Sequence, residues 1–178
     1  LNYLPDSQMP EGKALDSATN SAMSHLVRQP ANWYASRAGR ELATFAIQRL
    51  AANDPRVAAD ELEKIKGKLQ EPERQWAWSQ IALQAAKKHM TETLGWYANA
   101  GKTPLSDEAA QWKVRAALRA QEWGVVRDTI EAMPPALAAL PEWPYWLGRA
   151  MKAGGRTTEA DALFARIGGQ THFYGNLA

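Results

Sequence analysis

The chain has 178 residues, 46% of them hydrophobic, which is enough for one sizeable core. Its formal net charge of +2 is too small to indicate nucleic-acid binding, because basic side chains are interleaved with acidic ones. The absence of cysteine excludes disulfides and thiolate metal sites, and no apolar run in the sequence approaches the roughly 20 residues that a membrane span needs.

The N-terminal third is predicted to become helical after an irregular start. Residues 1–13 hold prolines, a glycine and polar side chains, and we expect them to be irregular. Residues 14–28 show a weak helical pattern that Pro30 interrupts, because proline cannot donate the backbone hydrogen bond of a helix interior. A long helix is predicted over residues 33–52. Its inward side chains are expected to be Leu42, Phe45, Ala46 and Leu50.

The next helix is predicted to start at Asp54 and Pro55, since aspartate is a favoured N-cap and proline suits the first helical position. Asp60 and Lys64 are expected to form an ion pair one turn apart on its outer face, which contributes about 0.2–0.5 kcal/mol. The inner face of this helix is expected to hold Ala58, Leu62, Ile65 and Leu69.

Three helical hairpins are predicted in the rest of the chain. The first pairs a helix that begins at Pro72 with residues 91–99, and the second pairs a helix that begins at Ser106 with residues 123–133. The last pairs residues 142–151 with 157–167, and the glycine pair after residue 153 tolerates the backbone angles of a helix end. The inward side chains of the hairpins are predicted to be Trp78, Ile81, Ala82, Ala85, then Trp112, Val114, Ala116, Leu118, Val126, Ile130, Met133, and finally Trp146, Leu147, Ala150, Met151, Ala160, Leu163, Phe164 and Ile167.

A spacing of 34 residues recurs in three sets of side chains. These sets are Trp78, Trp112 and Trp146; Ala82, Ala116 and Ala150; and Leu62, Trp96, Ile130 and Phe164. Large side chains that recur opposite small ones allow stacked helices to pack closely, and a period of this length is typical of α-solenoids. No segment alternates with a period of two, so no sheet is expected. The sequence therefore predicts an all-α fold, an α-solenoid or superhelix of stacked helical hairpins with a period near 34 residues.

The last hairpin carries a run of motifs that resembles a known family. Glu142-Trp143-x-Tyr145-Trp146 is followed by Gly155-Arg156-x-x-Glu159-Ala160, then by Phe173-Tyr174 and Ala178. The preceding hairpin contains Trp112-Lys113-x-Arg115-Ala116. In order and spacing these motifs resemble the helical doughnut region of the soluble lytic murein transglycosylases. The resemblance covers most of residues 33–178 and is strongest over residues 106–178.

The resemblance implies a periplasmic protein of bacterial cell-wall turnover, although no signal peptide is visible in the sequence. Enzymes of this family cleave the bond between N-acetylmuramic acid and N-acetylglucosamine and leave a 1,6-anhydromuramic end. They do so in a separate lysozyme-like domain with a Glu-Ser motif. No Glu-Ser pair occurs in this sequence, so no catalytic residue can be carried over. We expect a single helical domain over residues 1–178, a fragment of a larger chain, that is inactive alone and has the missing catalytic domain and peptidoglycan glycan strands as its partners.

Four tryptophans and four arginines are candidates for contacts with peptidoglycan. Indole rings stack on sugar faces, so those that lie off the repeat columns could line a glycan path, whereas packing between helices is the alternative role. These tryptophans are Trp33, Trp76, Trp123 and Trp143. The other four, Trp78, Trp96, Trp112 and Trp146, are predicted to be core. Arginines could meet acidic stem peptides or pair with carboxylates on helix surfaces, and these are Arg37, Arg40, Arg115 and Arg149.

No catalytic, cofactor-binding or metal-binding residue is predicted. The three histidines, His25, His89 and His172, are far apart in the sequence and have no ligand spacing. The carboxylates lie in stretches of mixed charge that are typical of solvated helix faces. A second hypothesis is a tetratricopeptide-like adaptor that binds a protein or peptide, because Leu147-Gly148 and Ala160-x-x-x-Phe164 partly fit such repeats.

Overall fold

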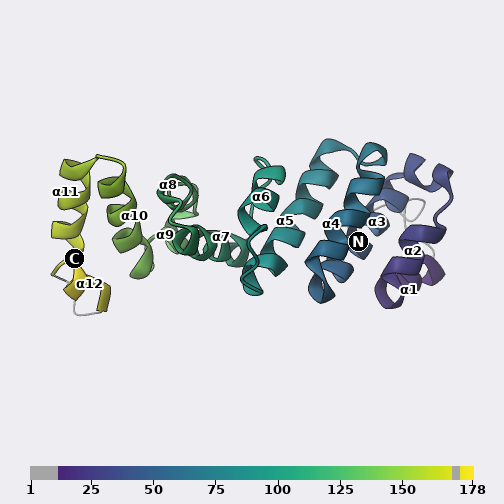
Figure 1. Cartoon of the computed structure of the whole chain (residues 1–178), viewed down its shortest axis with the longest axis horizontal. Coiled ribbons are helices and arrows are strands. Elements are labelled where there is room, and N and C mark those ends of the chain that lie inside the picture. Colours follow the sequence, from purple (N-terminus) through teal and green to yellow (C-terminus); the bar gives the residue numbers. More distant parts are fainter. Residues whose placement is uncertain (1–11, 170–172) are drawn as a thin grey trace. The chain divides into compact units, whose positions relative to one another are not determined.

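The computed structural model describes residues 12–169 and 173–178, and every regular element among them is helical (Figure 1). This confirms the predicted all-α class. The chain divides into two compact units, Leu1–Pro104 and Leu105–Ala178. The expectation that the whole chain forms one domain stays a prediction. In the described part of the chain, no helix is long and apolar enough to cross a bilayer.

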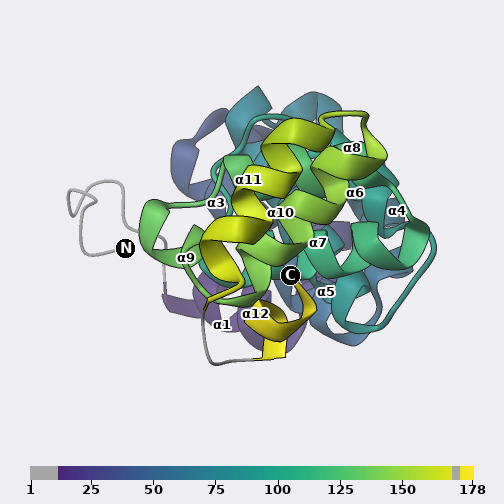
Figure 2. The same ribbon diagram turned by 90° about the vertical axis from the view of Figure 1, so that its left-hand side faces the viewer.

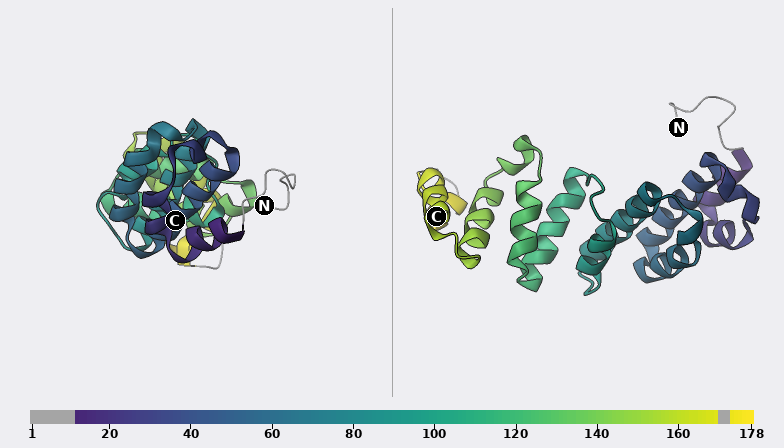
Figure 3. Two further views of the ribbon diagram at one scale, coloured as in Figure 1. Left: turned by 90° about the vertical axis from the view of Figure 1, so that its right-hand side faces the viewer. Right: turned by 90° about the horizontal axis from the view of Figure 1, so that it is seen from above.

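The first unit is a stack of helical pairs. Its helices are α1 (Gly12–Asn20), α2 (Ala22–Arg28), α3 (Arg37–Asn53), α4 (Pro55–Ile65), α5 (Glu71–Lys87) and α6 (Thr93–Asn99), with two short 3-10 helices, η2 (Ala31–Ala35) and η3 (Lys66–Lys68). α1 and α2 pack on α3, α3 and α4 pack on α5, and α5 packs on α6 (Figure 3). The segment predicted to be irregular extends two residues too far, because α1 already starts at Gly12. Residues 1–11 lie outside the described residues.

Two predicted helices are divided in the structure. The weak helix over residues 14–28 is broken at Ser21 into α1 and α2, and the long helix expected from Trp33 starts instead at Arg37, after η2. Ser36 causes the second break: its hydroxyl accepts a hydrogen bond from the Gly39 N–H at 3.0 Å and donates to the Trp33 carbonyl at 3.0 Å. A serine N-cap favours a helix start at this point over continuation of the preceding turn.

Gly39 lets η2 lie close against α3. A Cβ atom at this position would stand 2.1 Å from the Trp33 carbonyl oxygen, much nearer than real Cβ contacts allow. The joint between η2 and α3 therefore requires glycine at residue 39 for space, not for a special backbone angle.

The start of α4 is confirmed, and its predicted outer ion pair is wrong. The Asp54 side chain accepts from the backbone N–H groups of Arg56 and Val57, with Pro55 in the first turn. Lys64 binds Glu61 at 2.5 Å rather than Asp60. Glu61 is nearly buried, so it offers Lys64 a less hydrated carboxylate one turn away.

The core of the first unit consists mainly of alanine and branched aliphatic side chains, as the sequence predicted. Leu42, Ala46, Ala58, Leu62, Ile65, Leu69, Trp78 and Ile81 are all buried in it. Phe45 and Leu50, also predicted to point inward, are half-buried at its margin. The Trp78 ring stacks on Trp96 from α6, with centroids 6.4 Å apart, so the repeat-column tryptophans of this unit do pack between helices.

The second unit contains α7 (Asp107–Ala120), α8 (Trp123–Glu131), the short α9 (Pro135–Ala138), α10 (Glu142–Ala153), α11 (Thr157–Ile167) and α12 (Phe173–Leu177). α7 packs on α8, α8 on α10 and α10 on α11, while α12 contacts both arms of the last hairpin (Figure 2). α10 ends at Ala153, and Gly155 after it has a φ of +80°, as expected for the glycine pair.

The buried face of α10 differs from the prediction. Trp143, Tyr145, Gly148 and Ala150 are buried, whereas Trp146, Leu147 and Met151 are only half-buried. α10 has packed neighbours on two sides, α8 on one and α11 with α12 on the other, so a single predicted stripe could not describe it. Among the repeat-column tryptophans, Trp78 alone is buried, and Trp96, Trp112 and Trp146 are half-buried at helix margins. The alanine column, Ala82, Ala116 and Ala150, is buried throughout, as predicted.

Candidate ligand-contact surfaces

A polar hollow of about 700 Å³ lies in the first unit, between α1, α2 and η2. Its polar side chains come mainly from one face of α1 and α2, and they include Lys13, Asp16, Ser17, Asn20, Ser24 and Arg28. Trp33 and the His25 ring contribute its aromatic walls. Trp33 is one of the tryptophans that the sequence predicts as candidate glycan contacts. The polar face was not predicted, although its spacing of three or four residues follows the helical repeat.

His25 and Gln29 also line this polar hollow. His25 is 4% exposed, its ring meets the edge of Trp33 with centroids 5.8 Å apart, and the Gln29 amide donates to Nε2 at 2.6 Å. Burial lowers the pKa of the His25 imidazole below its ordinary value of 6.5, so the neutral ring is favoured. The Gln29 carbonyl oxygen is buried without a partner among the described residues. The hollow thus combines an indole ring with hydroxyl, amide and charged groups, the chemistry that binds a sugar.

A second, apolar hollow of about 520 Å³ lies between α1, α3 and α5. Its walls include Leu15, Leu42, Phe45, Pro72 and Trp76, with Glu41 and Glu73 among its lining residues. Trp76, a candidate for a glycan path, therefore faces an apolar hollow that suits an aliphatic or aromatic group better than a sugar.

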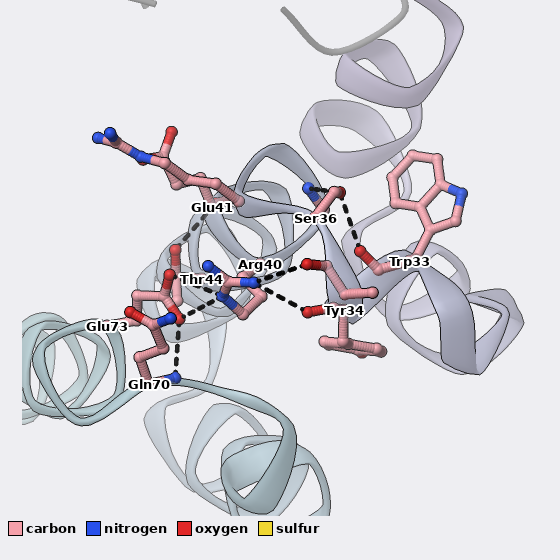
Figure 4. Close-up of polar contacts among 11 residues, drawn as sticks. Trp33, Tyr34, Ser36, Arg40, Glu41, Thr44, Gln70 and Glu73 are labelled. Carbon is pink, nitrogen blue, oxygen red and sulfur yellow. Dashed lines mark hydrogen bonds and ion pairs between the residues drawn. The ribbon is translucent and has the colours of Figure 1, made fainter. Parts of the chain in front are cut away.

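Two of the candidate arginines have carboxylate partners. Arg37 pairs with Glu41 at 2.6 Å on the surface of α3. Arg40 binds both carboxylate oxygens of Glu73, at 2.9 and 3.0 Å (Figure 4). These two arginines therefore take the helix-pairing role that the sequence analysis gave as the alternative to peptide binding.

The other two candidate arginines lie on aromatic rings. The Arg115 guanidinium is 5.3 Å from the ring centroid of Trp112 and 5.5 Å from that of Trp143. Arg149 lies 5.9 Å from the Tyr145 ring and donates to its hydroxyl at 3.0 Å. Neither arginine forms an ion pair within the described part of the chain, so both can still take an anion.

Of the remaining candidate tryptophans, Trp143 is excluded as a glycan contact, because it is 2% exposed and packs as a core side chain. Trp123 is half-buried at the start of α8 and lines neither hollow. Across residues 12–169 and 173–178, no group of three or more histidine or acidic side chains is placed to hold a metal ion. His89 is exposed after α5, and His172 lies outside the described residues.

Comparison with known proteins gives a likeness in structure. No family model matches the sequence. No curated protein sequence matches it either. Among solved structures, an inactive mutant of the lytic transglycosylase Slt from Pseudomonas aeruginosa superposes with a TM-score of 0.71 at 22% sequence identity, over 94% of this chain. The chain therefore has a fold found in a lytic transglycosylase.

The chain spans 28% of the length of the transglycosylase Slt structure. At 22% identity the likeness establishes the fold and leaves the activity open. It agrees with the family resemblance that the motifs of the last two hairpins predict, and the match extends beyond those hairpins to nearly the whole chain.

Proposed function

We propose that this chain is a non-catalytic helical part of a soluble lytic murein transglycosylase and that it holds peptidoglycan for the catalytic domain of that enzyme. The observation that carries the proposal is the structural likeness to Slt over 94% of the chain. On this proposal the parent enzyme cleaves the N-acetylmuramic acid–N-acetylglucosamine bond to 1,6-anhydromuramic products in the periplasm.

The polar hollow beside Trp33 is the surface that we assign to the glycan. A sugar ring has an apolar face that stacks on an indole and a rim of hydroxyls that needs hydrogen-bond partners. Trp33 supplies the indole, and Asn20, Ser24 and Arg28 supply polar groups around it. Trp76 lines the apolar hollow instead.

Co-sedimentation with purified sacculi tests the assignment. Trp33→Ala is expected to weaken binding about fivefold, because loss of one aromatic stacking contact costs roughly 1 kcal/mol. Trp76→Ala is the matched control, since it removes another half-buried indole of the same unit from the apolar hollow, and it is expected to leave sedimentation unchanged. Equal losses in the two variants, or no binding by the unaltered chain, would contradict the assignment.

A digestion assay tests the non-catalytic role. The purified chain, incubated with sacculi, is expected to release no anhydromuropeptides, since glycoside cleavage needs a positioned carboxylic acid and the sequence has no Glu-Ser pair. Release that persists in a preparation free of other enzymes would overturn this part of the proposal.

A protein-binding adaptor is the second candidate function, and the apolar hollow favours it. Side chains from three helices leave about 520 Å³ between them, a volume that accepts one or two apolar side chains of a partner. The same variants separate the two functions: a partner that depends on Trp76 and not on Trp33, with no binding to sacculi, would favour the adaptor.

A further inference from the structure

Arg115 and Arg149 occupy equivalent places in the second unit. They are 34 residues apart, one period of the repeat, and each lies three residues after a repeat-column tryptophan, Trp112 or Trp146. Equivalent positions of neighbouring repeats lie on the same face of successive hairpins, although the surroundings differ here, since Arg115 is half-buried and Arg149 is exposed. The position corresponding to them one repeat earlier is Ile81, which is buried, so the pair is confined to this unit.

Arg115 is held in place by rings. It projects from α7, is half-buried, and lies between the indoles of Trp112 and Trp143, at 5.3 and 5.5 Å. Its only described hydrogen bond goes to the Gln111 side-chain oxygen, at 3.5 Å. A guanidinium between two aromatic faces is fixed in orientation while the N–H groups along its edge remain unused. Fixing the cation in advance lowers the entropy cost of binding an anion.

Arg149 contacts the first of three neighbouring aromatic rings, the last of which belongs to an exposed phenylalanine. It contacts Tyr145, whose ring lies 5.6 Å from that of Tyr174, and Tyr174 in turn lies 5.2 Å from Phe173. Phe173 is 68% exposed, a large value for a phenylalanine that has ring neighbours. An unpaired cation and an open aromatic ring thus belong to one connected cluster.

Five other arginines of the chain are already paired with carboxylates. Arg37, Arg40, Arg56, Arg127 and Arg156 each form an ion pair with Asp or Glu. Within the described residues, Arg115 and Arg149 form none. Each contacts an aromatic ring and, among the residues that the structure describes, no carboxylate, so its charge is available to an external anion.

We propose that Arg115 and Arg149 bind the carboxylates of an acidic peptide whose apolar side chains pack on Trp146 and Phe173. Planar guanidinium edges match carboxylates through paired hydrogen bonds, and the open rings favour a ligand that is apolar between its charges. The net charge of +2, with acids interleaved among the bases along the sequence, does not favour nucleic acid as the ligand. The proposal does not depend on glycan binding at Trp33, which lies in the other unit.

Fluorescence anisotropy with a labelled peptide of alternating glutamate and leucine residues tests this surface. Arg115→Gln is expected to weaken binding about tenfold and Arg149→Gln about threefold, because a charge-assisted bond is stronger where it is less hydrated. Arg115→Lys keeps the charge but loses the planar stack, and an intermediate loss is expected. Arg37→Gln, which removes an arginine that already has a carboxylate partner, is the control and should bind like the unaltered chain.

The same peptide with glutamine in place of glutamate should not bind. Circular dichroism of each variant checks that it is folded, and since Arg149 is exposed, its variant remains informative if Arg115→Gln unfolds. Equal binding of the glutamine peptide, unchanged affinity in both glutamine variants, or tighter binding of a single-stranded oligonucleotide than of the peptide would overturn the proposal. If the chain binds the acidic peptide but not sacculi, the glycan assignment at Trp33 is contradicted and the peptide site at Arg115 and Arg149 is supported.

Discussion

The guanidinium of Arg40 in α3 lies 2.9 Å from a carboxylate oxygen of Glu73 in α5, and the two side chains are only 12% and 17% exposed. The same guanidinium donates to the backbone carbonyls of Tyr34 and Ala35, and Glu73 accepts from the Gln70 N–H at 2.8 Å (Figure 4). One ion pair therefore joins η2, α3 and the first turn of α5, and its Glu73 side chain also lines the apolar hollow.

Replacing Glu73 by glutamine is expected to lower the free energy of unfolding by about 2–3 kcal/mol, because it leaves a poorly hydrated guanidinium without its counter-charge. Chemical denaturation followed by circular dichroism measures the change. Glu41→Gln is the matched control, since its pair with Arg37 is exposed and should contribute less than about 0.5 kcal/mol. Equal effects of the two changes would mean that burial does not strengthen the Arg40 pair.

Gly148 in α10 is expected to tolerate no side chain. A Cβ atom there would stand 2.5 Å from the Phe164 ring of α11, so Gly148→Ala should destabilise the second unit by about 1–3 kcal/mol through overpacking. Amide hydrogen exchange would locate the loss in α10 and α11. Gly124→Ala in α8 is the control: nothing lies within 4 Å of its Cβ, and the change should be neutral or stabilising by up to about 1 kcal/mol. Unaltered exchange in the Gly148 variant would show that the ring moves aside freely.

The folded protein is expected to become less stable as the pH is lowered, because of His25. Burial places its folded-state pKa below 6.5, so protonation favours the unfolded chain, and the imidazole must also accept the Gln29 amide hydrogen. The stabilisation is complete above about pH 6.5 and is lost as the pH falls through the lower folded pKa. Thermal unfolding measured between pH 7.5 and 5 should show an unfolding temperature that declines with pH, and the decline should be shallower in His25→Gln. An identical decline in both proteins would assign the effect to other groups.

The N-cap of α4 gives a further test. Asp54→Ala removes the acceptor for two backbone N–H groups and should cost about 1 kcal/mol. Asp60→Ala, six residues later on the same helix, should change stability by less than about 0.5 kcal/mol, because Lys64 is bound by Glu61. A larger loss of stability in Asp60→Ala than in Asp54→Ala would support the ion pair between Asp60 and Lys64 that the sequence predicts.

The helical repeat was predictable because it depends on local spacing. The alanines at 82, 116 and 150 recur with the period and are all buried, since only a small side chain lets neighbouring helices approach. Asp54 and Pro55 marked a helix start correctly because capping involves only nearby backbone. The tryptophans were less predictable: Trp143 was a candidate for exposure and is buried, while Trp146 was assigned to the core and is half-buried.

The sequence by itself determined that this protein is a succession of amphipathic helical hairpins, because apolar periodicity and caps act within one turn or one hairpin. Only the tertiary structure decided which charges are neutralised. Arg40 and Arg115 look alike in sequence, yet one meets Glu73 across 33 residues and the other meets two indole rings. Ion pairing depends on distances between helices, and those distances follow from packing that no local pattern encodes.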